Sequence, residues 1–116
     1  MHSVTSNAVY EAIACVEVAS SDTNWLIQKL GNGKYIATGW NKSSGTYSSG
    51  ANPIAFTIPT GYKLSKVLNG NAFAQGNVYN VTQAIHAVGT TGIRMYVASG
   101  DYSVGDMRIQ CILEDN

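Results

Sequence analysis

Short segments in which apolar and polar residues alternate determine the fold class of this sequence. A period of two puts the apolar side chains on one face of a β-strand. The period is clear at 14–19, at 93–97 and at 107–113, and Gly and Asn, which tolerate turn conformations, separate many of the segments. With 116 residues the chain is long enough to form one core without disulfides or metal, so we expect a single all-β domain.

Two predicted hairpins support the prediction of an all-β domain. In NWLIQKLGNGKYIATGW the turn falls at Gly31–Gly33, and in VYNVTQAIHAVGTTGIRMYVASG it falls at Gly89–Gly92. In the final predicted strand, DMRIQCILED, the period places four side chains in the core: Met107, Ile109, Cys111 and Leu113. Seven or eight such strands predict an antiparallel β-sandwich, preceded by a short N-terminal helix.

The remaining segments are less regular. In IAFTIP the alternation predicts Ile54, Phe56 and Ile58 inward and Ala55 outward. KLSKVLNGNAFAQGN predicts one or two strands, interrupted around Asn69 and Gly70. Asn41–Pro53 is the longest polar stretch and has no apolar period, so it is expected to be a loop.

The N-terminal segment SVTSNAVYEAI has a helical pattern instead. Ala8, Val9, Ala12 and Ile13 would share one side of a helix, which Ser6 or Asn7 could cap. A helix of about two turns is not stable alone in water, because nucleation is costly and isolated helices need roughly 12 to 15 residues. The stripe must therefore pack on another surface, and we divide the chain into a helical segment, 1–13, and a β-sandwich head, 14–116.

Composition excludes several classes of partner. Charged residues make up 12% of the chain, and seven Lys and Arg balance seven Asp and Glu. Nucleic acid and anionic membranes attract basic patches, so we expect neither as a partner. No apolar run approaches the roughly 18 residues that span a bilayer, and the N-terminus lacks the pattern of a signal peptide, so we expect no membrane insertion.

No pattern of catalytic or metal-binding residues stands out, so we expect neither an enzyme nor a cofactor or metal. The nearest candidates are Asp101 and Asp106, which flank YSVG in a predicted turn, where aspartates commonly form local hydrogen bonds. His86 falls mid-strand and is interpreted as a core or subunit-contact residue. Cys15 and Cys111 are interpreted as buried free thiols, although a disulfide between the first and last strands stays open.

Aromatic residues beside amides and hydroxyls are the best candidates for a binding site. Trp40 ends a predicted strand and leads into the polar stretch, which carries Tyr47, with Asn41 and Asn52 nearby. An indole offers a flat apolar face to the C–H face of a sugar ring, and amides can bind the hydroxyl rim. These four residues form the predicted ligand site, and burial of Trp40 in the core or a subunit contact is the alternative.

The segment VTSNAVYEAI, Val4 to Ile13, resembles a short segment found in bacteriophage and prophage tail fibres and receptor-binding proteins, where it precedes a β-rich C-terminal module. The remainder, with AIHAVGTTGIRMYVASG and a final strand VGDMRIQCILED, is similar to the head of such a fibre in architecture and composition. The resemblance implies a homotrimeric virion protein. Three helices would then bury Ala8, Val9, Ala12 and Ile13 around a three-fold axis.

The resemblance also implies a function and a location. The expected function is attachment of the phage to a bacterial surface glycan or protein, with other tail proteins as partners. The protein would be assembled in the bacterial cytoplasm and then reside in the virion. A structural virion component, such as a capsid-decoration or baseplate protein without a host ligand, is the alternative; a small depolymerase is the least favoured.

Overall fold

The computed structural model describes residues 15–41, 45–47, 54–74, 81–97 and 102–116 of the chain, and these residues are all-β. They form nine strands: β1 Cys15–Ala19, β2 Thr23–Gly31, β3 Lys34–Asn41, β4 Gly45–Tyr47, β5 Ile54–Thr57, β6 Tyr62–Ala74, β7 Thr82–Val88, β8 Gly92–Val97 and β9 Tyr102–Asp115. The predicted helix at 8–13 lies outside the described residues.

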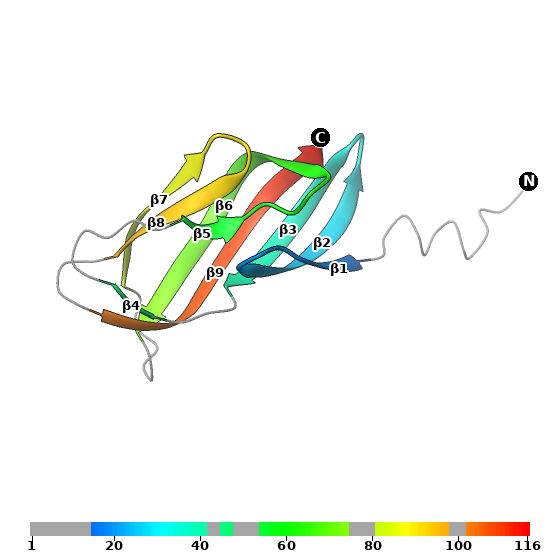
Figure 1. The fold of residues 1–116 in the computed structure, drawn as a ribbon. Helices are drawn as coiled ribbons and strands as arrows, with labels where there is room; N and C mark the ends of the chain where they lie inside the picture. The colour runs from blue at the N-terminus through cyan, green and yellow to red at the C-terminus, as the bar shows by residue number, and fades with distance from the viewer. Residues whose placement is uncertain (1–14, 42–44, 48–53, 75–80, 98–101) are drawn as a thin grey trace, which may run out of the picture.

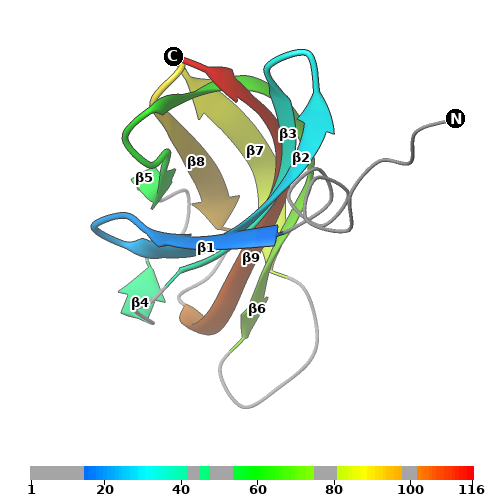
Figure 2. The same cartoon turned by 90° about the vertical axis from the view of Figure 1, so that its right-hand side faces the viewer.

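The strands form two antiparallel sheets (Figure 1). The larger has six strands in the order β1-β2-β3-β9-β4, and β6 also pairs with β9. The smaller has the order β5-β8-β7. Figure 2 shows the smaller sheet on one side of the larger one, a sandwich-like arrangement, with β1 at the free edge of the larger sheet.

The core lies between the two sheets. Trp25 of β2 and Phe56 of β5 meet there edge to face, with ring centroids 6.4 Å apart. The side chains predicted to be inside on the last strand are all buried: Met107, Ile109, Cys111 and Leu113 are at most 3% exposed. Burial of this apolar surface supplies the main driving force for the fold.

Both predicted hairpins are confirmed. The turn between β2 and β3 has positive φ angles at Gly31 (104°), Asn32 (55°) and Gly33 (72°), a conformation that Gly and Asn tolerate best. The turn between β7 and β8 lies at 89–91. Each hairpin fixes which residues of its two strands share a face.

A hydrogen-bonded carboxylate joins the two sheets at one end. Asp22 accepts hydrogen bonds from the backbone N–H of Thr57 (3.0 Å) and from its hydroxyl (2.8 Å). The indole N–H of Trp25 donates to the carbonyl oxygen of Thr57 (3.0 Å), so the same residue of β5 contacts β2 as well. These bonds hold the edge of the smaller sheet over β2.

Two predictions about strands were wrong, and a third was confirmed. The stretch 41–53 is not entirely a loop, because it contains β4, which pairs with a β9 that begins at Tyr102 rather than near Asp106. The confirmed prediction concerns 62–74, which form one strand with a register shift between Val67 and Asn69, at the expected interruption. Ala55 is buried at 2% instead of facing outward, because a register shift between Ile54 and Phe56 breaks the alternation.

Two further predictions about burial were wrong. Cys111 is buried and free as expected, but Cys15 is an exposed free thiol, since β1 is an edge strand that the smaller sheet does not cover. His86 is exposed rather than in the core, so only the subunit contact stays a prediction for it, and its ring packs edge to face against Tyr96, with centroids 5.1 Å apart.

Candidate functional site

The larger sheet has two unlike faces. One face packs against the smaller sheet, and within the described residues no strand covers the other, which we call the outer face. Trp40 of β3 lies on it and is 36% exposed, whereas its strand neighbour Gly39 is buried on the opposite face. An exposed indole on the outer face is a candidate binding element.

Strand register defines the surroundings of Trp40. Residues directly opposite in neighbouring strands project to the same face. One row across the sheet is Ala19, Asn24, Trp40, Arg108 and Asn71. The adjacent row on the same face is Glu17, Leu26, Thr38, Gln110 and Asn69. The outer face near Trp40 is therefore rich in amides, with one carboxylate and one guanidinium.

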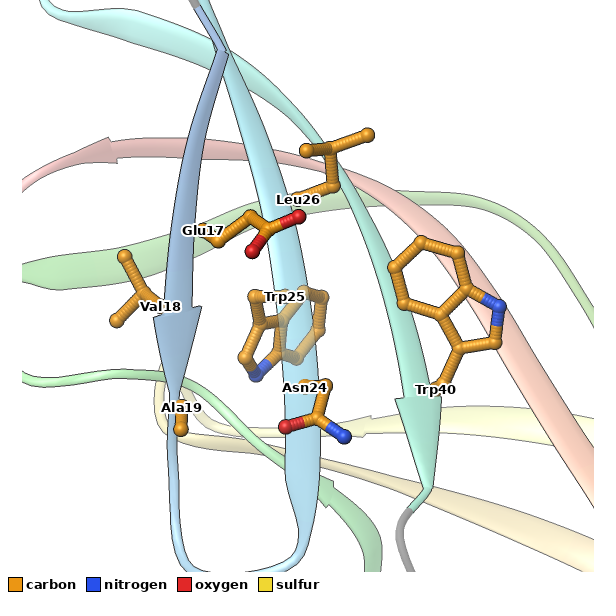
Figure 3. Close-up of a pocket in the computed structure, with 7 residues that line it drawn as sticks. All are labelled: Glu17, Val18, Ala19, Asn24, Trp25, Leu26 and Trp40. Carbon is orange, nitrogen blue, oxygen red and sulfur yellow. The ribbon is translucent and has the colours of Figure 1, made fainter.

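One hollow on this face has a volume of about 440 Å³ and is formed by β1, β2 and β3. Figure 3 shows the indole of Trp40 along one side, and Glu17, Leu26 and Asn24 along the other. Val18 and Trp25 also line it, but strand alternation points their side chains to the inner face, so they contribute backbone. The hollow combines an apolar wall with a carboxylate and an amide.

The second hollow, of about 180 Å³, lies on the other side of β3. Its lining includes the side chains of Thr38, Gln110, Asn69, Asn71 and Arg108. Amides both donate and accept hydrogen bonds, and so do hydroxyls, which makes this lining suited to a hydroxyl-rich ligand. The Asn69 side-chain oxygen already accepts a bond from the N–H of Gly70 (2.8 Å), which fixes the orientation of that amide.

The charged end of the outer face lies further along the same strands. Glu114 of β9 is flanked by its cross-strand neighbours Lys34, at 2.5 Å, and Lys63, at 3.9 Å. The hydrogen bond from Lys34, followed by one from Ser65, lowers the pKa of the Glu114 carboxyl from its ordinary value. The one carboxylate compensates only one of the two lysines, so these three side chains leave a net charge of +1 at this end of the face.

The four predicted ligand residues are not all placed. Trp40 is on the outer face, as its proposed role requires. Asn41, the next residue, donates its amide N–H to the carbonyl oxygen of Ala55 in β5 and so contacts the other sheet. The side chain of Tyr47 and all of Asn52 lie outside the described residues, as do Ala8, Val9, Ala12 and Ile13, so their roles stay predictions.

The described residues offer few groups for catalytic or metal chemistry. The described residues contain no group of three or more His, Cys, Asp or Glu side chains placed to hold a metal ion. Asp101 lies outside them, and Asp106 belongs to β9 rather than to a turn. Among the described residues, no helix has the length and apolar character needed to cross a membrane.

Sequence reasoning missed most residues around Trp40. Asn24, Asn69, Asn71, Thr38 and Gln110 come from four strands, and nothing in their local sequence marks them as neighbours. The period of two along each strand could have shown that each of these side chains points away from the core. Bringing them together required the pairing of β3 with β9 and of β9 with β6, which joins distant parts of the chain.

No protein-family model, curated protein sequence or solved structure matches this chain.

Proposed function

We propose that the chain is the receptor-binding head of a phage tail fibre, and that it attaches to a bacterial surface glycan through the outer face. The observation that carries the glycan-binding part is the position of Trp40, exposed on the outer face between a hollow of mixed polarity and an amide-lined one. Sugar recognition needs a flat apolar surface next to groups that bind hydroxyls, and this face supplies both.

The fibre part of the proposal rests on the resemblance of Val4–Ile13 to the segment that precedes fibre heads. In this view 1–13 forms a short helix, three copies of which pack around an axis through Ala8, Val9, Ala12 and Ile13. The trimer joins other tail proteins in the virion after assembly in the bacterial cytoplasm.

Glycan binding is tested with immobilised lipopolysaccharide and capsular polysaccharide from a panel of gut bacteria. The full chain is expected to bind at least one of them, and Trp40→Ala to lose about tenfold or more in affinity. Trp40→Phe, which keeps an aromatic face, should retain more binding. Leu30→Ala is the matched control, because Leu30 is also an exposed apolar side chain (57%) but lies outside both hollows.

The fibre proposal is tested by the mass in solution. Light scattering of the full chain should give about three times 12.3 kDa. Ile13→Asp should dissociate this trimer by placing a charge in the apolar stripe, whereas Glu11→Gln, outside the stripe, should not. A monomer in every case would reject trimerisation through the segment and favour a decoration protein instead.

A further inference from the structure

The two hollows on the outer face also indicate how long the bound glycan is and how its chain is oriented relative to the strands. We propose that the face binds a neutral linear oligosaccharide that crosses the strands, with one sugar in each hollow and Trp40 between them. This inference rests on the proposed function. It adds a minimum ligand length, an orientation and a second contact region on β9 and β6.

The register places the hollows in one line. Asn24, Trp40, Arg108 and Asn71 are successive cross-strand partners on β2, β3, β9 and β6, so Trp40 lies between the first hollow and the second. Neighbouring strands are about 4.8 Å apart, so the five strands from Ala19 to Asn71 span about 19 Å. A span of this length exceeds one sugar ring, and its long axis runs across the strands.

The two hollows are lined by different side chains, so the two sugars would make different contacts. The β1–β3 hollow has Trp40 on one side and Leu26 on the other as apolar contacts, with Glu17 and Asn24 at its polar positions. It suits a ring whose C–H face packs on the indole while its hydroxyls reach the carboxylate. The smaller hollow offers amides and Thr38, which suit a ring recognised through its hydroxyls.

The charges in the two hollows favour a neutral ligand. Glu17 and Arg108 are the two charged side chains in the linings, one per hollow and of opposite sign. A polyanionic chain would bring a negative group close to Glu17, and a polycationic one would place a positive group close to Arg108; each contact is repulsive. A chain of uncharged sugars avoids both of these repulsive contacts.

The test uses a polysaccharide that binds the full chain and its size-fractionated hydrolysis fragments, from single sugars upward, in calorimetric titrations. Affinity should increase by about tenfold or more between the single sugar and the fragments that fill both hollows, and then level off. Asn71→Ala should weaken binding of the longer fragments and leave the single sugar's affinity unchanged, if the single sugar occupies the Trp40 hollow. Asn24→Ala should weaken both.

Three results would overturn the inference and leave the proposed function standing. The first is a single sugar that binds as tightly as the long fragments. The second is an Asn71→Ala variant that binds every fragment with wild-type affinity. The third is a charged fragment that binds more tightly than neutral ones. Failure of all polysaccharides to bind would instead contradict the proposed function. Loss of the oligomer in Trp40→Ala, seen by light scattering, would assign the face to a subunit contact and reject both.

Discussion

The two tryptophans lie on neighbouring strands of one sheet and have opposite roles. Trp25 of β2 is 1% exposed, packs against Phe56 and donates its N–H to the carbonyl oxygen of Thr57. Trp40 of β3 is 36% exposed, and its side chain lines an open hollow. The same residue type thus stabilises the core on one face and offers a contact surface on the other, and the strand period decides which.

The largest expected effect comes from removing the inner tryptophan. Trp25→Ala should lower the free energy of unfolding by about 3 to 5 kcal/mol, because it leaves a cavity and removes the bond to Thr57. Trp40→Ala should lower it by less, about 1 to 2 kcal/mol, because this side chain is already 36% exposed. Urea unfolding of both variants measures the difference, and equal losses would contradict the distinction between the faces.

A second effect tests how tightly the inner face is packed beneath Trp40. A Cβ atom added at Gly39 would lie 2.8 Å from Cζ3 of Trp25 and 2.9 Å from Cγ2 of Thr23. Gly39→Ala should therefore destabilise the protein by about 1 to 3 kcal/mol through overpacking. Thr38→Ala, one residue away on the outer face, is the control, with an expected change within about 0.5 kcal/mol. A neutral Gly39→Ala would show that Trp25 has room to move.

The two cysteines extend the comparison between buried and exposed positions to the pH dependence of stability. Burial raises the pKa of the Cys111 thiol to about 12 from the ordinary value of 9.0, whereas Cys15 is exposed on the edge strand. Since the folded state holds this thiol neutral, its contribution to stability is complete below pH 9 and is lost as pH rises toward 12. At pH 10 the loss should be roughly 1 kcal/mol.

Unfolding curves at pH 8 and pH 10 measure this loss. The wild type should lose about 1 kcal/mol more than Cys111→Ala over that interval, because the variant has no thiol to ionise. Cys15→Ala should behave like the wild type. An unchanged pH dependence in Cys111→Ala would mean that this thiol is not shielded from water in the folded state.

The smallest effect belongs to the charged end of the outer face. Lys34, Ser65 and Lys63 lower the pKa of Glu114 below its ordinary value of 4.5. Its carboxylate therefore contributes stability above pH 4.5, and the contribution is lost as pH falls through the lower folded pKa. Glu114→Gln should flatten the acid limb of the stability profile slightly, and added salt should have a similar effect. An unaltered acid limb would show that these exposed ion pairs add no stability.

Much of the inner face could be predicted from sequence. The period of two identified Met107, Ile109, Cys111 and Leu113 as core residues, and the Gly and Asn turns located both hairpins. Predictions of strand and burial failed where the pairing between strands departed from what the local apolar period indicated. The register shift at β5 buried Ala55, and the partner strand β9 turned Gly45–Tyr47 from a predicted loop into a strand.

The candidate site was less predictable for a physical reason. Trp40 stood out because an aromatic residue preceded a polar stretch, but its exposure depends on which face the smaller sheet covers. Gln110 and Asn71 are more than 30 positions apart in the sequence and meet only because β6 pairs with β9. Contacts of this kind follow from tertiary pairing, which no local period encodes.

The central claim is that Trp40 contacts a surface glycan while Trp25 remains a core residue. The most direct test is fluorine NMR of the full chain labelled with 5-fluorotryptophan, since its two tryptophans give one signal each, assigned with Trp40→Phe. On titration with a polysaccharide that binds, the Trp40 signal should shift and saturate while the Trp25 signal stays in place. Saturable binding that leaves the Trp40 signal unmoved would contradict the account.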